Sequence, residues 1–282
     1  GMEYDRYSDE WSDVFETESS DRAFEEEVML SGFGQAPVKS EGAAVSFDTA
    51  NEAYTARYTH ETIALAFAIT EEAVEDNLYD RLSTRYTRAL ARSMSNTKEV
   101  KGANILNNAF DSTFTFGDGK ELCATDHPTV GGGNFRNELT TSADLNETSL
   151  EQSLIDIAAF IDERGLLVAV QGRKLVIPPA LQFVADRLMA STLRPGTADN
   201  DINAIRNMGM LADGYTVNHY LTDTDAFFIK TDAPNGFKHF ERSPVKTSME
   251  GDFDTGNVRY KARERYSFGV SDPRCVFGSP GA

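Results

Sequence analysis

The sequence contains few of the residues on which disulfide scaffolds and metal sites depend. It has two cysteines, Cys123 and Cys275, and four histidines in 282 residues. Two cysteines are too few for a disulfide framework, so a reducing compartment is the default expectation. A chain of this length buries about 75% of its unfolded surface and needs no covalent staple. The composition predicts one large domain or two intertwined ones.

Long apolar runs and positive charge are also scarce. No segment approaches the ~18 consecutive apolar residues of a membrane span, so no membrane partner is expected. The chain has 27 Lys and Arg against 45 Asp and Glu, a net charge of −18. A protein that reads nucleic-acid sequence would be basic. The balance excludes that class, but not a protein that encloses nucleic acid without gripping it.

Common enzyme motifs are missing as well. The sequence has no G-x-S-x-G elbow, no G-x-x-x-x-G-K loop and no G-x-G-x-x-G after a strand. Cys123 and His127 have the spacing of two zinc ligands, but a zinc site needs three or four. Residues 199–203 begin like a calcium loop, but Ala204 occupies the position that needs glycine. We expect no catalytic residue, no cofactor and no metal. An acidic metal-dependent enzyme that uses one of these loops is the least favoured alternative.

An acidic segment with regularly placed rings opens the chain. Residues 1–35 contain eleven acids against Arg6 and Arg22. Because a disordered tail is poor in aromatic residues, the rings predict an arm that docks on another surface. Trp11, Phe15 and Phe24 are the candidate contacts. A flexible acidic leader is the alternative.

The next segment is rich in β-forming residues. Residues 43–47 and 54–67 are typical of strands, and 48–51 of a turn between them. The pattern predicts a long hairpin over residues 36–68. A two-stranded hairpin is marginal alone, so we expect it to lie on another surface of this subunit or the next, with Tyr54 and Tyr58 as candidate contacts.

Residues 69–94 have the spacing of one long helix. An apolar band recurs every three or four residues and ends at Leu90, with a row of arginines beside it. At ~1.5 Å per residue the helix spans roughly 40 Å, which suits a spine for other elements. An ordinary amphipathic surface helix is the alternative. The row consists of Arg81, Arg85, Arg88 and Arg92.

The remaining chain alternates unevenly between helix and strand. The pattern predicts helices over 103–110 and 145–165, the latter capped by Asn146 or Thr148, and a helix that Pro179 opens. It predicts strands at 166–170, 174–177, 237–240 and 258–268, and a strand pair at 215–221 and 226–230. The long irregular segment 111–145 suggests a functional or interface-forming loop. This order indicates an α+β fold.

Cations gather near the C-terminal end, opposite in sign to the N-terminal arm. Complementary ends suit head-to-tail contacts between subunits, and ion pairing within one chain is the open alternative. The cations are Lys230, Lys238, Arg242, Lys246, Arg259, Lys261, Arg263 and Arg265.

The order of these parts resembles the major capsid protein of tailed phages, which has the Hong Kong 97-type fold, and Mu-like head subunits in particular. Two motifs carry the first half of the resemblance: YTARYTHETIALAFAITEEAVEDNLYDRLSTRYTRALARSM and ANILNNAF. The second half is carried by KLVIPPALQFVADRLM, NDINAI, DTDAFFIKTD, GFKHFERS and RYKARERYSFGVSDPRCVFG. The resemblance covers nearly the whole chain.

The resemblance implies the fold and its parts. Residues 1–35 would be the N-terminal arm and 36–68 the extended hairpin (E-loop). The peripheral (P) domain would hold 69–177 and 236–282, and the axial (A) domain 178–235. Some relatives cross-link subunits through a hairpin lysine. Here only Lys39 is available, near the expected base of the hairpin, so that chemistry is not carried over.

The resemblance also implies a structural protein and not an enzyme. Copies of the chain would form hexamers and pentamers of an icosahedral shell that encloses double-stranded DNA without sequence-specific binding. A portal and a cement or decoration protein would be partners, and assembly in the host cytoplasm would place the chain in the virion. The alternative is an encapsulin-like nanocompartment shell with a cargo enzyme. The expected contacts between subunits are Trp11, Phe15, Phe24, Tyr54, Tyr58, Arg81, Arg85, Arg88 and Arg92.

Overall fold

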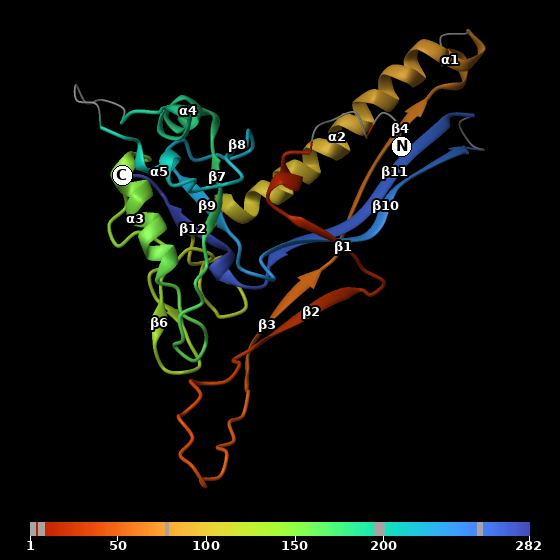
Figure 1. Cartoon of the computed structure of the whole chain (residues 1–282). Helices are drawn as coiled ribbons and strands as arrows, with labels where there is room; N and C mark the ends of the chain where they lie inside the picture. Colours follow the sequence, from red (N-terminus) through yellow and green to blue (C-terminus); the bar gives the residue numbers. More distant parts are fainter. Residues whose placement is uncertain (1–3, 5–8, 77–78, 195–200, 253–255) are drawn as a thin grey trace. The chain divides into compact units, whose positions relative to one another are not determined.

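The structure is a computed structural model that describes residues 4, 9–76, 79–194, 201–252 and 256–282, without the side chains of 79–82. The chain forms two compact units (Figure 1). The first, here the arm–sheet unit, consists of Gly1–Glu25, Tyr58–Ala103 and Lys238–Gly269. The second, here the finger–lobe unit, consists of Glu26–Arg57, Asn104–Phe237 and Val270–Ala282. Within the described ranges, no helix is long and apolar enough to cross a membrane.

A four-stranded sheet organises the arm–sheet unit. Its order is β1 (Glu16–Ser19), β10 (Phe237–Gly251), β11 (Val258–Val270) and β4 (Glu61–Ile69). β11 and β4 run antiparallel over nine residue pairs, while β1 lies parallel to β10. The predicted strands at 237–240 and 258–268 are confirmed, and β10 is much longer than its prediction. Its burial pattern explains why: only its first residues are buried, so its later part lacks an apolar signal.

The long helix is present but displaced along the chain. A short helix α1 (Glu71–Glu75) precedes α2 (Tyr79–Asn107), which is 29 residues long. The prediction of a helix ending at 94 and a separate piece at 103–110 is wrong, because α2 runs through the polar stretch between them. Lys98, Glu99 and Gly102 are buried there, so tertiary packing offsets the weak helix propensity of residues such as Gly102.

A second four-stranded sheet forms the core of the finger–lobe unit. Its order is β12 (Val276–Ser279), β9 (Phe227–Thr231), β7 (Gly172–Ile177) and β8 (Tyr215–Val217). The helices α3 (Glu147–Ala158), α4 (Gln182–Ala190) and α5 (Ala204–Asn207) belong to the same unit, and a 3-10 turn, Pro179–Leu181, leads into α4. Leu150, Leu175 and Phe277 belong to its apolar core and are fully buried. The strand prediction at 174–177 and the helix opened by Pro179 are confirmed.

Three predictions for this unit are wrong. β8 and β9 flank β7 and do not pair with each other, because the sheet places β7 between them. The helix predicted to reach 165 ends at Ala158, and Gly165 instead occupies a left-handed turn with φ +82°. Residues 166–170 form one isolated bridge, Ile161 with Leu167, and no strand. The Asn146 cap is confirmed: its side chain accepts a hydrogen bond from Ser149 N at 2.9 Å.

The predicted hairpin has different boundaries in the structure. β2 (Phe24–Leu30) pairs with β3 (Glu52–Thr59), and residues 31–51 between them contain neither helix nor strand. We call β2, this loop and β3 the finger (Figure 1). The predicted strand at 43–47 is absent, and the one at 54–67 breaks at His60, because β3 pairs with β2 whereas β4 pairs with β11. The short β5 (His127–Pro128) and β6 (Asn134–Phe135) also pair.

Candidate assembly surfaces

The N-terminal arm docks on its own unit. Trp11 lies in a 3-10 turn, Trp11–Asp13, and its side chain and that of Phe15 are buried. The Trp11 ring centroid lies 4.4 Å from that of His239 and 5.6 Å from that of Phe268, and Phe15 lies 4.9 Å from Phe268. The expectation that Trp11 and Phe15 face another subunit is corrected, because their apolar area is already removed from water inside the subunit.

Two buried charges hold the docked arm. The Glu99 carboxylate accepts hydrogen bonds from the backbone N–H groups of Glu10 at 2.8 Å and Trp11 at 3.0 Å. Burial raises the pKa of Glu99 to about 7, against the opposing effect of those two N–H donors. The Lys98 ammonium lies 4.7 Å from the Trp11 ring centroid and 5.2 Å from that of Tyr266. These contacts position the rings by cation–π attraction.

The acids of the arm also meet cations of the same unit. β1 lies beside β10 in a register that places Glu16 opposite Lys238. Lys238 Nζ lies 3.0 Å from Glu18, and Arg242 lies 4.0 Å from Asp21. Of the two readings of the opposed charges, ion pairing within one chain therefore applies to these acids.

His60 marks the point where β3 gives way to β4. Its Nε2 lies 2.8 Å from Ser20 Oγ, and its Nδ1 lies 3.0 Å from Ser267 Oγ. Ser20 Oγ donates to Glu25, so it accepts from His60 Nε2–H, which places a hydrogen on Nε2. Burial, and then Arg265, lower the pKa of His60, which favours the neutral ring with this hydrogen.

The arginine row lies on the exposed part of α2. Arg85, Arg88 and Arg92 are exposed, while the side chain of Arg81 lies outside the described residues. Of the predicted apolar band, Leu90 is buried, but Val74 and Tyr86 are exposed in the single subunit. The first half of the helix therefore presents both cations and apolar side chains to its surroundings.

The finger exposes apolar side chains in its loop. Phe47 is 98% exposed and Val38 97%, and Phe33 and Val45 are also exposed. The two sides of the loop border an open space of about 510 Å³ lined by residues between 33 and 48. The side chains of one side therefore do not bury those of the other. Side chains this apolar and this exposed mark an interaction site.

One aspartate fastens the finger loop to its own unit. Asp48 accepts a hydrogen bond from Gly34 N at 2.8 Å and lies 3.2 Å from the Arg164 guanidinium. The backbone N–H groups of Gly34 and Thr49, more than Arg164, lower the pKa of Asp48. Because water and salt screen an exposed ion pair of this kind, it contributes little to the stability of the subunit.

The three aromatic candidates near the finger differ in exposure. Phe24 is exposed, whereas Tyr58 is buried with its ring 4.8 Å from that of Phe240. The Tyr54 ring packs on Gly117, where a Cβ would lie 2.5 Å from the ring. Tyr58 is thus corrected to a contact within the subunit, while Phe24 stays a candidate for contact with a neighbour.

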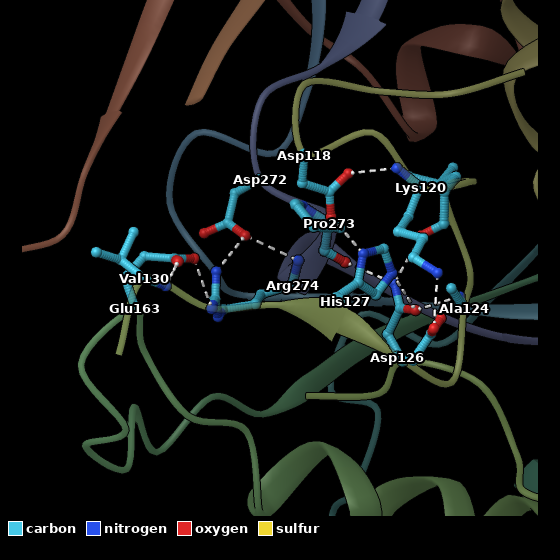
Figure 2. A network of polar contacts seen from close by, with 12 residues as sticks. Asp118, Lys120, Ala124, Asp126, His127, Val130, Glu163, Asp272, Pro273 and Arg274 are labelled. Atoms are coloured by element: carbon cyan, nitrogen blue, oxygen red, sulfur yellow. Dashed lines mark hydrogen bonds and ion pairs between the residues drawn. The ribbon is translucent and has the colours of Figure 1, made fainter. Parts of the chain in front are cut away.

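A buried polar network lies within the finger–lobe unit (Figure 2). Arg274 bonds to Glu163 at 2.9 Å and to Asp272 at 3.2 Å, and it also donates to the Ile161 carbonyl at 2.7 Å. Its guanidinium lies 4.1 Å from the Phe135 ring centroid. All three charged side chains are nearly inaccessible, so this group stabilises the fold only while every partner is present.

A second part of the network centres on His127. Its Nδ1 lies 2.5 Å from Asp118 (Figure 2). Its Nε2 lies 2.9 Å from Asn137 Oδ1. Asn137 in turn donates to the carbonyls of Leu122 at 2.7 Å and Pro273 at 2.9 Å. These bonds attach the irregular segment 111–145 to the C-terminal segment.

The candidate metal ligands are engaged elsewhere. Burial raises the pKa of the Cys123 thiol well above its usual range, and His127 is committed to Asp118 and Asn137. Asn203 caps α5 and accepts a hydrogen bond from Arg206 N at 3.3 Å, while residue 199 lies outside the described part. Among the described residues, no group of three His, Cys, Asp or Glu side chains has a metal-binding arrangement.

Sequence reasoning missed both buried networks. Arg274, Glu163 and Asn137 come from segments more than 20 residues apart, and none belongs to a motif with a fixed spacing. The one usable signal was the length of the irregular segment 111–145, which indicated a loop with a role of its own.

One family model matches most of the chain. The family described as phage capsid protein matches residues 53–278. No curated protein matches the sequence. Among solved structures, the capsid of an empty GTA particle has a TM-score of 0.63 at 11% identity and covers 98% of this chain and 91% of its own. The capsid of cyanophage P-SCSP1u has a TM-score of 0.61 at 12% identity, covering 96% and 88%.

The similar structures also include a particle that is not described as a phage capsid. The virus-like particle from Pyrococcus furiosus has a TM-score of 0.52 at 10% identity, covering 99% of this chain and 94% of its own. At such low identities these likenesses establish the fold, which is the Hong Kong 97-type fold expected from the sequence.

Proposed function

The chain belongs to the phage capsid protein family and is a structural protein of a capsid built from its own copies, and from this premise we propose the kind of shell and its contents. The shell is icosahedral, contains hexamers and pentamers, and encloses the double-stranded DNA of a tailed phage. It assembles in the host cytoplasm, with a portal and a cement or decoration protein as further partners.

The exposed finger loop carries this proposal. Phe33, Val38 and Phe47 are too exposed to stabilise the single subunit. Asp48 of the same loop pairs with Arg164 within the subunit. A neighbouring copy would bury these side chains, at ~25 cal/mol per Å² of apolar surface removed from water. Shell subunits form obligate interfaces of ~2,000 Å² or more, which exposed loops of this kind supply.

The exposed candidates complete the proposed contact surface. Phe24, Arg85, Arg88 and Arg92 face away from the core of their own units. We place the arm at the residues before β2 and the extended hairpin at β2, the loop and β3, which moves the expected boundary of the hairpin toward the N-terminus. The P domain (69–177 and 236–282) and the A domain (178–235) are kept as proposed.

Net charge supports the proposed relation to DNA. With −18 charges per copy, the shell repels phosphate groups on average. Such a wall lets the genome slide during packing and release, without sequence-specific contacts. In this proposal, acidic segments of neighbouring copies contact the exposed arginines on α2.

Electron microscopy of the purified chain tests the proposal. Concentrated protein should form closed particles, tubes or capsomers, and a stable monomer at every concentration would contradict it. Phe47→Ser together with Val38→Ser should block assembly and leave the subunit folded. Gln35→Ser, an exposed polar change in the same loop, is the matched control and should assemble normally.

An encapsulin-like nanocompartment shell is the second candidate. The likeness to the virus-like particle from Pyrococcus furiosus favours it, since the same fold occurs there. The contents of particles isolated from the natural source separate the two candidates: double-stranded DNA supports the phage capsid, and a cargo protein supports the compartment.

A further inference from the structure

The hydrogen bonds around Asn137 fix the orientation of its amide. The side chain is fully buried, and its Nδ2 faces two carbonyl oxygens, those of Leu122 and Pro273. Its Oδ1 accepts a hydrogen bond from the backbone N–H of Ala124 at 2.8 Å. A flipped amide would oppose an NH₂ group to an N–H and an oxygen to two carbonyls. Oδ1 is therefore the atom that faces His127.

This orientation determines which ring nitrogen of His127 carries a hydrogen. Nε2 lies 2.9 Å from an oxygen that can only accept, so Nε2 bears a hydrogen. Nδ1 lies 2.5 Å from the carboxyl group of Asp118. The other Asp118 oxygen accepts a hydrogen bond from Lys120 N at 3.1 Å, so any proton of the carboxyl group lies on the oxygen that faces Nδ1. A neutral ring with its hydrogen on Nε2 would oppose a lone pair on Nδ1 to that carboxylate at contact distance.

From this geometry we propose that the buried pair His127–Asp118 retains one additional proton, placed between Nδ1 and the carboxylate, and that this proton clamps the segment 111–145 to the C-terminal segment. The proton connects Asp118 of the loop to His127 in β5. Asn137 bonds both to His127 and to the Pro273 carbonyl. Without it, the pair repels and the loop opens.

The charges of the surrounding cluster support a retained proton. Asp118, Glu163 and Asp272 contribute −3 and Arg274 contributes +1, so the cluster has a charge of −2 with a neutral His127 and −1 with the proton. Uncompensated buried charge is costly, so the protonated form is favoured. Phe135 lies between these parts, stacked on His127 at 4.8 Å between ring centroids and contacted by Arg274.

The other titratable groups near the pair do not reproduce its behaviour at alkaline pH. Burial raises the pKa of Tyr54 and of both buried thiols, so these groups keep their protons. Burial also raises the pKa of Asp272, and Asp126 raises that of Lys120 through a hydrogen bond. The charged or titratable groups around the pair are Tyr54, Lys120, Glu121, Cys123, Asp126, Glu138, Glu163, Asp272, Arg274 and Cys275.

The clamp also bears on the finger. Gly117, next to Asp118, is the residue on which the Tyr54 ring of β3 packs. A loosened loop would therefore remove the support of β3 within the finger–lobe unit. This consequence for assembly rests on the proposed function, whereas the protonation of His127 does not.

Nuclear magnetic resonance of ¹⁵N-histidine in unassembled subunits tests the proton directly. The chain has four histidines, and the spectrum of His127→Gln identifies the signals of His127. We expect at pH 7–8 a hydrogen on Nε2 and a far-downfield proton shared by Nδ1 and Asp118. A bare Nδ1 with no shared proton, in a subunit whose loop stays protected from hydrogen exchange, would overturn the proposal.

Hydrogen exchange of the loop tests the clamp. After correction for intrinsic exchange, protection of the Cys123 and Asn137 amides should fall by up to about tenfold per pH unit once the proton is released. Asp118→Asn should abolish this dependence, because an amide can bond to Nδ1 with or without its hydrogen. Asp126→Asn, which removes the exposed partner of Lys120 in the same loop, should keep the dependence of the unmodified chain. Equal pH dependence in Asp118→Asn and the unmodified chain would refute the clamp.

Discussion

Replacing Trp11 by alanine tests whether the arm belongs to the fold of its own subunit. The Trp11 side chain is 7% exposed and contacts His239, Phe268 and Lys98. Removal of a buried tryptophan ring costs ~3–5 kcal/mol, and loss of the ring beneath a desolvated ammonium adds ~1 kcal/mol. We therefore expect the free energy of unfolding of the arm–sheet unit to fall by about 4–6 kcal/mol. That is a large share of the ~5–15 kcal/mol typical of a domain.

Urea unfolding of unassembled subunits, followed by circular dichroism, measures this change. Phe47→Ala is the control, because Phe47 is 98% exposed and its loss should change the free energy by only ~0.5 kcal/mol. Since Trp11 is the one tryptophan of the chain, its fluorescence adds an independent measure of docking. Emission typical of a solvated indole, or a change under ~1 kcal/mol for Trp11→Ala, would refute the docked arm.

Two further predictions concern buried charges. Arg274→Met should cost ~3–5 kcal/mol, because Glu163 and Asp272 are left buried without a cation. Arg173→Met, at the exposed pair with Asp213, should cost at most ~1 kcal/mol. A similar cost for both in thermal or urea unfolding would contradict the distinction. Glu99→Gln should alter the pH dependence of stability. The pKa of Glu99 is raised from 4.5 to about 7, so its contribution is fully present below pH 4.5 and lost as the pH rises to about 7. The unmodified subunit should lose up to about 3 kcal/mol across that window, and Glu99→Gln should lose less. An unchanged slope would show that Glu99 is not the titrating group.

The parts of the fold that the sequence predicted are those with their own periodicity. β7, β11, the cap at Asn146 and the helix after Pro179 were found because local spacing and turn chemistry specify them. α2 was shortened in the prediction because Ser95 to Thr97 and Gly102 are weak helix formers. Contacts of Lys98, Glu99 and Gly102 with the arm stabilise the helix there. Strand pairing was predicted poorly, since β7 lies between β8 and β9 through contacts distant in sequence.

The finger illustrates a different limit. Residues 43–47 have β-forming side chains, but β3 pairs with β2, and within the described part of the chain no strand pairs with 43–47. Trp11 and Phe15 were expected to contact another subunit because aromatic rings in an acidic segment need a surface to pack on. The sequence does not say whether that surface belongs to the same subunit or to a neighbour. Asn137 gave no signal and His127 appeared only as a possible zinc ligand, because the role of the pair depends on the carbonyl of Pro273, far along the chain.

Protease cleavage in the open loop of the finger also reports whether a copy of the chain has assembled. Lys39 is exposed near the middle of that loop, and no other lysine or arginine lies between Arg22 and Arg57. Irregular, exposed backbone is the preferred substrate of proteases. Trypsin should therefore nick free subunits first at Lys39, leaving two fragments that stay associated through β2 and β3. Copies whose loops are covered by neighbours would resist cleavage. The fraction of chains cleaved in a short digestion therefore measures the fraction that has not assembled.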